Sequence, residues 1–290
     1  MRYFLVLPDK SNKEVSYDGI TAEDDQGHGV EEPHTQKGYV NAVRGLAKFY
    51  HRSPDTLSRE EVQDYLLYLE RDRKVAWGST KVAVCAFRFF FGVTVQNPEM
   101  RLAIPARKTQ RRLPEVLSRE EVMRIINGVS NLKHRVLLMT TYSGGLRVSE
   151  VVSLKLSDLD FSRMTIRVEL GKGAKDRYTL LSRRLVKELE EYIKHRRITH
   201  WLFPSYKEGV HVNVTAAQQV YAKARMKAQV SHGSGIHTLR HCFATHLLED
   251  GVDIATIQKL MGHRQISTTA RYLHLTAEGF HRVDSPLDKC

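Results

Sequence analysis

Apolar residues recur at three- and four-residue spacing from about Thr35 onward, the pattern of helices that each bury one face. In the first hundred residues this spacing predicts three helices, which begin near Thr35, Ser58 and Ser79. The tetrapeptide SREE at Ser58 also has the form of a capping box, in which Glu61 reaches back to the first backbone amide. Pro98 is expected to end this helical unit because proline disfavours helix in the residue before it.

The helical pattern resumes after the prolines and is interrupted once by a different period. Further helices are expected at about 118–128, 132–143, 147–155, 182–196, 213–228, 237–249, 252–261 and 266–274. Between them, MTIRVEL at 164–170 and RYTLL at 177–181 have the composition of strands and flank the turn GKGAKD. The sequence therefore predicts a mainly α fold with a small antiparallel β-sheet inserted into its second half.

The length of 290 residues is enough for two domains of ordinary size. Four segments are expected: an acidic lead-in at 1–32, a helical domain at 33–100, a linker at 101–114 and a second domain at 115–290. The linker, RLAIPARKTQRRLP, has two prolines, five cations and no anion. It fits a connector that lies along an anionic ligand, and it also fits a solvated connector.

The formal net charge of +12 is concentrated in the carboxy-terminal two-thirds of the chain. Residues 1–32 have three cations and eight anions, residues 33–100 have ten and seven, and residues 101–290 have 32 and 18. This distribution favours a polyanionic partner such as nucleic acid for the later part of the chain. A basic protein with no such partner remains the alternative on charge alone.

Composition narrows the class of protein further. A hydrophobic content of 41% and a charged content of 27% are typical of soluble domains, and the first residues lack the features of a signal peptide. A cytoplasmic protein without a membrane partner is therefore expected. The cysteines are widely spaced and indicate neither a disulfide framework nor a zinc module; they are Cys85, Cys242 and Cys290.

Two clusters of chemically useful residues lie in the first part of the second domain. Arg147 follows the pair Gly144 and Gly145, which would let backbone approach a ligand at a helix start. Lys172 lies between glycines in GKGAKDR, at the tip of the predicted hairpin. No P-loop spacing accompanies it. Alone, Arg147 is equally typical of a surface arginine at a junction between two helices. Lys172 alone is equally typical of a common glycine-rich turn that contains lysine.

A third concentration runs from His237 to Tyr272. Arg240 follows His237 by three residues, so both side chains project from one face of the expected helix. An imidazole beside a guanidinium suits an anionic, phosphate-like ligand, although a single helical histidine is more often structural. His241 and His246 add the possibility of a metal site, but no HExxH motif or suitably spaced carboxylate supports zinc.

In this order, the clusters closely resemble the tyrosine recombinase (phage integrase) family, over residues 35–285. The matching residues are Arg147 in GGLRVSE, Lys172 in GKGAKDR, His237 and Arg240 in HTLRHCFATHL, His263 in LMGH and Tyr272 in STTARY. The ordered set is highly specific, whereas each motif alone is weak. One departure is Cys242, where the family more often has serine.

The resemblance implies an enzyme that cuts and rejoins DNA. Tyr272 would attack a phosphodiester and form a covalent 3′-phosphotyrosyl link, which stores the bond energy, so neither ATP, metal nor another cofactor is expected. Arg147 and Arg240 would each donate two hydrogen bonds to the non-bridging phosphate oxygens.

The same resemblance gives the remaining groups proton-transfer and supporting roles. His263 would donate to the phosphate, His237 would accept or shuttle the proton of the nucleophile, and Lys172 would protonate the departing 5′-oxygen. Glu150 is expected to orient its neighbours. Additional DNA contacts are expected from Arg107, Lys108, Arg111, Arg112, Lys175 and Arg177.

The family's architecture implies a helical, SAM-like core-binding domain and a mixed α/β catalytic domain that clamp double-stranded DNA. The expected assembly is a homo-tetramer on two recombination sites, located in the cytoplasm with the nucleoid, with or without accessory proteins. Integration or excision of a mobile element is the favoured role. The alternatives are Xer-type dimer resolution, an inactive DNA-binding relative and a type IB topoisomerase.

Overall fold

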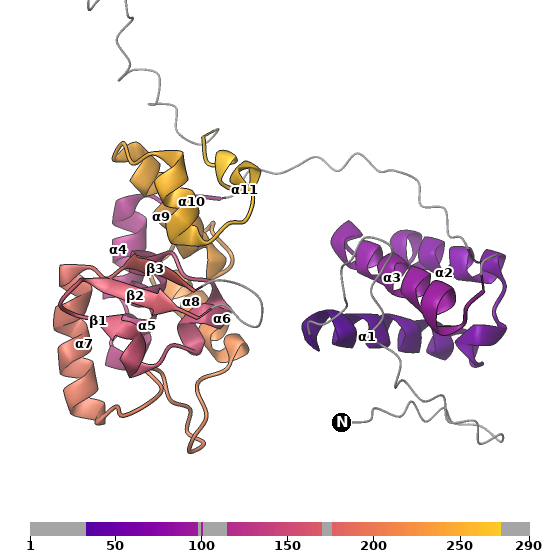
Figure 1. The fold of residues 1–290 in the computed structure, drawn as a ribbon, viewed down its shortest axis with the longest axis horizontal. Helices are drawn as coiled ribbons and strands as arrows, with labels where there is room; N and C mark the ends of the chain where they lie inside the picture. Colours follow the sequence, from indigo (N-terminus) through magenta and orange to yellow (C-terminus); the bar gives the residue numbers. More distant parts are fainter. Residues whose placement is uncertain (1–32, 98–99, 101–114, 170–175, 274–290) are drawn as a thin grey trace, which may run out of the picture. The chain divides into compact units, whose positions relative to one another are not determined.

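In the computed structural model the chain forms two compact units, Met1–Thr109 and Gln110–Cys290, each with its own hydrophobic core. The structure describes residues 33–97, 100, 115–169 and 176–273 (Figure 1). The expected acidic lead-in and cationic linker both lie outside these residues.

The first unit is a small helical domain. Its elements are α1 (Pro33–Tyr50), η1 (Pro54–Thr56), α2 (Arg59–Arg71), α3 (Trp77–Phe89) and the π-helical turn η2 (Phe90–Thr94). The capping box predicted from SREE is present, because Ser58 and Glu61 each accept a hydrogen bond from the other's backbone amide. The aromatic residues Phe87, Phe90 and Phe91 are all buried in the core of this unit.

The second unit is also mainly helical and contains the small sheet, so the predicted fold class is confirmed. Its elements are α4 (Arg119–Asn127), α5 (Leu132–Gly144), α6 (Val148–Val152), η3 (Leu156–Asp158), β1 (Leu159–Asp160), β2 (Thr165–Val168), β3 (Arg177–Leu180), α7 (Arg183–Arg196), α8 (Val214–Lys227), α9 (His237–Glu249), α10 (Ile254–Met261) and α11 (Ile266–Ala270).

Polar caps fix where several of these helices begin. A side chain accepts a hydrogen bond from an amide of the first turn at Ser118, Asn131, Ser182, Asn213 and Asp253. Two expected helices are shorter in the structure. The chain leaves α6 at Val152 and soon forms a bridge from Lys155 to Trp201. After α11, the amides of Tyr272 and Leu273 bond to carbonyls three residues back, which makes a tighter turn than an α-helix.

The sheet has the order β1-β2-β3, and both of its pairings are antiparallel. The two expected strands correspond to β2 and β3, and β1 is an addition. Ile166 on β2 pairs with Thr179 on β3. On β3, Arg177 and Thr179 are buried and alternate with the exposed Tyr178 and Leu180. This alternation turns Arg177 toward the interior of the unit.

The elements that carry the motifs of the second half of the chain gather beside this strand. Helix α5 packs against α9, and α10 lies against β3, α9 and α11 (Figure 1). Gly145 ends α5 in the left-handed conformation, with φ of 58°. A Cβ there would lie 2.2 Å from Cδ1 of Phe243 on α9, so only glycine permits this close approach.

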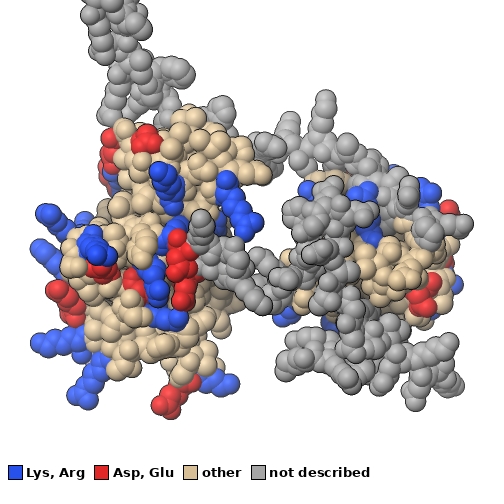
Figure 2. Space-filling view, viewed as in Figure 1, with Lys and Arg blue, Asp and Glu red and all other residues tan. Residues whose placement is uncertain are grey.

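Charged side chains are distributed over the second unit rather than gathered in a single cluster on the face shown. Figure 2 shows Lys and Arg side chains projecting at several points from that face, with Asp and Glu between them. Buried charges are few among the described residues and concentrate near α6, β3 and α9, where Arg177 and Arg240 are 7% and 5% exposed. Burying such cations is costly unless they are paired.

Candidate active site

Arg147 is held where α5 turns into α6. The left-handed Gly145 redirects the chain, and Arg147 becomes the N-cap of α6. The Glu150 carboxylate accepts from the backbone amide and from Nη1 of Arg147, each at 2.7 Å. The Arg147 side chain keeps 37% exposure, so its guanidinium is fixed at one end and open to a ligand.

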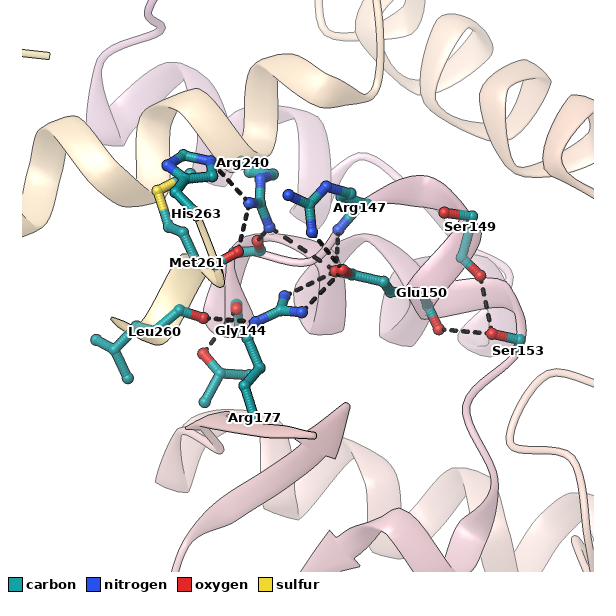
Figure 3. Close-up of polar contacts among 12 residues, drawn as sticks. Gly144, Arg147, Ser149, Glu150, Ser153, Arg177, Arg240, Leu260, Met261 and His263 are labelled. Carbon is teal, nitrogen blue, oxygen red and sulfur yellow. Dashed lines mark hydrogen bonds and ion pairs between the residues drawn. The ribbon is translucent and has the colours of Figure 1, made fainter. Parts of the chain in front are cut away.

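Glu150 is the centre of a buried ionic network (Figure 3). Its side chain is only 8% exposed and accepts from Nη1 and Nη2 of Arg177, both at 2.8 Å. Arg240 Nη1 lies 3.8 Å from the same carboxylate. Burial alone would raise the pKa of Glu150, but the hydrogen bonds and charge of Arg177, together with the hydrogen bonds of Arg147, lower it to about 2. Glu150 is therefore ionised at neutral pH.

Arg240 projects from α9 and is fixed by the backbone of two other segments. Its guanidinium donates to the carbonyl oxygens of Gly145 and Met261, and Nη2 lies 3.0 Å from His263 Nε2. Burial lowers the pKa of Arg240 to about 10, assisted by the charge of Arg147. The guanidinium thus stays charged at neutral pH and is held in place before any ligand arrives.

His263 follows the left-handed Gly262 that ends α10. Its Nδ1 lies 2.9 Å from the hydroxyl of Thr269, and burial, followed by the charge of Arg240, lowers its pKa to about 4. A neutral imidazole can accept from Arg240 through Nε2 and donate to Thr269 through Nδ1. Donation to a phosphate, as the sequence suggests for His263, would require this Arg240 contact to rearrange.

Tyr272 is 2% exposed, and its phenol lies 2.9 Å from Nδ1 of His241. Burial raises the pKa of this phenol, while the positive charges of Arg240, Arg271 and Arg147 act in the opposite direction. The phenol is therefore protonated at neutral pH and hydrogen-bonded to a histidine that sequence reasoning considered only as a metal ligand. The periodicity could have indicated it, since His241 is one helical turn after His237.

His237 is exposed at the first position of α9. Its pKa is lowered by burial and by the charges of Arg240 and Arg147. Within the described part of the chain, no hydrogen bond joins His237 to Tyr272. The histidine that contacts the Tyr272 phenol is instead His241, one helical turn later on α9.

Arg177 does not have the placement expected of a DNA contact. Its guanidinium is bound to Glu150 and, through Nε, to the carbonyl of Leu260 at 2.9 Å. Arg177 was expected to contact DNA, but the alternation of β3 turns this side chain toward the interior of the unit. The other expected catalytic and DNA-contacting cations lie outside the described residues, and these are Lys172, Arg107, Lys108, Arg111, Arg112 and Lys175.

The histidines once considered for metal binding have other partners. His246 contacts the Leu117 carbonyl through Nε2 at 3.0 Å and the Tyr142 hydroxyl through Nδ1 at 2.7 Å. Among the described residues, no group of three or more His, Cys, Asp or Glu side chains is placed to hold a metal ion. None of the helices in the described ranges is long and apolar enough to cross a membrane.

Comparison with known proteins places this constellation in a family. Residues 115–278 match the phage integrase family, and residues 30–99 match the N-terminal SAM-like domain of phage integrases. The chain belongs to the phage integrase family. The predicted relationship to tyrosine recombinases is confirmed, and the family's two-part organisation covers both units of this integrase-family chain.

The relatives of this phage integrase family member include both integrase-type and Xer-type names. A candidate integrase/recombinase of Sinorhizobium fredii, y4qK, is 41% identical over 255 residues, covering 88% of this chain and 83% of that protein. The tyrosine recombinase XerA of Pyrococcus horikoshii is 32% identical over 237 residues, covering 80% and 81%.

A solved structure supports the fold. The Tn1549 transposon integrase, in complex with transposon right end DNA, matches with a TM-score of 0.68 over 87% of this chain and 93% of that one. At 18% identity, this likeness concerns the fold alone.

Proposed function

We propose that this protein is a tyrosine-type site-specific DNA recombinase, which cuts and rejoins DNA through a 3′-phosphotyrosyl link to Tyr272. The observation that carries the proposal is the guanidinium pair of Arg147 and Arg240 around the single carboxylate of Glu150. Both guanidinium charges also act on the phenol of Tyr272. Two fixed cations beside a tyrosine suit a phosphodiester, whose transition state gains negative charge.

The side chains of Arg147 and Arg240 differ in their exposure and in their contacts before DNA binds. Arg147 is partly exposed and can donate directly to an incoming phosphate, whereas Arg240 is nearly buried and already oriented by two backbone carbonyls. Because their positions are set by Glu150 and the backbone, little reorganisation is needed when DNA binds. In the proposed reaction, these two guanidinium groups provide the positive charge that stabilises the phosphate, and no metal ion takes part.

The proposed reaction has two mirrored halves. Tyr272 gives its phenol proton to a histidine base, for which the family resemblance suggests His237, and its oxygen bonds to phosphorus. The bond from phosphorus to the 5′-oxygen breaks, and Lys172 donates a proton to that oxygen. In the second half, a 5′-hydroxyl attacks the phosphotyrosyl link and the phenol leaves. The role of Lys172 rests on its motif, GKGAKDR, which lies in the sequence between β2 and β3 and outside the described residues. His263 would then contact the phosphate together with Arg240.

The proposed partner is double-stranded DNA, held by both domains and bound largely through phosphate contacts. The excess of 32 cations over 18 anions in residues 101–290 supports this. We further propose a homo-tetramer on two recombination sites, in the cytoplasm with the nucleoid, and integration or excision of a mobile element as its role. Xer-type dimer resolution is the alternative, and sequencing the joined products would distinguish the two.

The direct test is trapping on a nicked suicide DNA substrate, from which the cut end diffuses away. Wild-type protein is expected to form an adduct that resists denaturation, and Tyr272→Phe is expected to form none. Tyr206→Phe is the matched control, because Tyr206 is fully exposed and the same hydroxyl is removed. The substrate must carry the target site, which covalent trapping on genomic DNA followed by sequencing would identify.

The result also separates the neighbouring functions. An adduct with Tyr272→Phe would overturn the choice of nucleophile. Failure of the wild type to trap any genomic DNA covalently, although it still binds duplex DNA, would support an inactive DNA-binding relative. Relaxation of supercoiled DNA without joining of two sites would support a type IB topoisomerase instead.

A further inference from the structure

His241 is placed to act on the nucleophile, yet neither its sequence motif nor the roles proposed above assign it a function. It lies on α9, one helical turn after His237, and its Nδ1 is 2.9 Å from the Tyr272 hydroxyl. The two rings are 5.8 Å apart between centroids and tilted by 47°. This is hydrogen-bond geometry at the one oxygen that must bond to phosphorus.

The surroundings of the phenol make this contact directional. Tyr272 packs in an apolar cluster with Phe243, Ile257 and Met261, where an unpaired hydroxyl proton would be costly. Among the described residues, the hydrogen-bond partner of this hydroxyl is Nδ1 of His241. If Nδ1 donated instead, the phenol proton would lack an acceptor in that cluster. The satisfied arrangement is therefore Tyr272 donating to an unprotonated Nδ1.

The charge state of His241 agrees with this direction. Burial lowers its pKa to about 4, and three neighbours act in the same direction: His237, Arg271 after α11, and Arg240 on α9. The imidazole is thus neutral near pH 7 and free to accept. A phosphate arriving beside these cations brings negative charge, which favours the imidazolium form at the moment when the phenol loses its proton.

We propose that His241 is the proton acceptor for Tyr272 in the cleavage step, in place of the exposed His237. The inference rests on the recombinase function proposed above. As the Tyr272 oxygen bonds to phosphorus, its proton moves to Nδ1 of His241, the bond to the 5′-oxygen breaks, and a separate acid protonates that oxygen. In rejoining, the imidazolium returns the proton to the departing phenolate, so the enzyme ends unchanged.

The test uses His241→Gln in the full chain, because glutamine can still accept a hydrogen bond but cannot take a proton. Single-turnover cleavage of the suicide substrate is expected to slow by about 10² to 10⁴, the range of general acid–base catalysis. DNA binding and the unfolding temperature should stay within error of wild type. His195→Gln, at an exposed position of α7, is the matched control and should cleave like wild type.

A second substrate distinguishes the base that accepts the Tyr272 proton from the acid that protonates the 5′-oxygen. A bridging sulfur in place of the 5′-oxygen leaves without needing a proton, so it should restore cleavage by Lys172→Ala and leave His241→Gln slow. Cleavage by His241→Gln at the wild-type rate would overturn the inference, as would restoration of His241→Gln by the sulfur substrate. If His237→Gln cleaves slowly on both substrates while His241→Gln cleaves at the wild-type rate, His237 accepts the Tyr272 proton instead.

Trapping on the suicide substrate also tests the recombinase function separately from the role of His241. If wild type forms an adduct and Tyr272→Phe does not, the recombinase chemistry stands whatever His241→Gln does. If the wild type forms no adduct, the proposed function itself fails. For a variant that does not fold, His241→Asn provides a smaller acceptor that also cannot take a proton.

Discussion

Arg177 and Glu150 form the most constrained pair of side chains around the candidate site. Both oxygens of the carboxylate are bound by one guanidinium, and Arg177 also reaches the carbonyl of Leu260, just before Gly262. A Cβ at Gly262 would lie 2.6 Å from Cδ of Arg177, so the arginine stem fills the space that glycine leaves. Arg177 thereby connects β3, α6 and the end of α10.

Replacing Arg177 by lysine tests whether it positions Glu150 or contacts DNA. A lysine keeps the charge but loses the two-pronged fork, so Glu150 and, through it, Arg147 should be less well oriented. We expect single-turnover cleavage to slow about tenfold, with the salt dependence of DNA binding unchanged. Arg184→Lys, at an exposed position of α7, is the control. A change in the salt slope of binding with cleavage intact would restore the DNA-contact interpretation.

Glu150 also predicts how stability depends on pH. Its pKa falls from an ordinary 4.5 to about 2 on folding, so its contribution is fully present above about pH 4.5 and is lost as the pH falls through 2. For this nearly buried group the contribution is about 3 kcal/mol at neutral pH. Urea unfolding should show Glu150→Gln less stable than wild type at pH 7, with a smaller difference at pH 3. Equal differences at both values would contradict this.

At the scale of elements, the turn from α5 to α6 depends on one glycine. Gly145→Ala would place a methyl group against the Phe243 ring in a left-handed backbone conformation. We expect a loss of stability of about 2 to 4 kcal/mol, from strain and displaced packing together. Thermal unfolding measures it, with Gly235→Ala as the control, because a Cβ there meets nothing within 4 Å. Equal unfolding temperatures would show that the turn can adjust.

The sequence predicted local features better than the contacts between distant elements. The capping box at Ser58 was predictable because it spans four consecutive residues. The short strand β1 was missed, since two residues carry no periodic signal. The helix predicted at 266–274 was also too long, since α11 ends at Ala270. The turn at Tyr272 depends on backbone hydrogen bonds, which apolar spacing does not reveal.

Within the candidate site, the motifs identified which residues to consider but not how they pair. Arg177, which ends the GKGAKDR motif, was expected to contact DNA. Which face of β3 is buried depends on how the sheet packs against α10, and the sequence does not specify that packing. His241 was passed over for the same reason: its partner, Tyr272, is far along the chain and meets it only in the folded unit.

At the scale of the whole molecule, charge sets a prediction for DNA binding. Residues 101–290 carry 14 more cations than anions, so binding should release counterions and weaken steeply as salt rises. If six to ten phosphates are contacted, affinity should fall by about 10³ to 10⁵ between 50 and 200 mM salt. Fluorescence anisotropy on a labelled duplex measures this. A flat salt response would contradict binding through the phosphate backbone.

The central claim is that Tyr272 becomes covalently joined to DNA, and mass spectrometry of the trapped adduct tests it most directly. After nuclease and trypsin digestion, the tyrosine should lie in the peptide of residues 272–282, or in 265–282 if cleavage at Arg271 is blocked, and each contains a single tyrosine. The account predicts that this peptide carries a nucleotide 3′-phosphate on Tyr272. A nucleotide on any other residue, or a 5′-linked one, would contradict it.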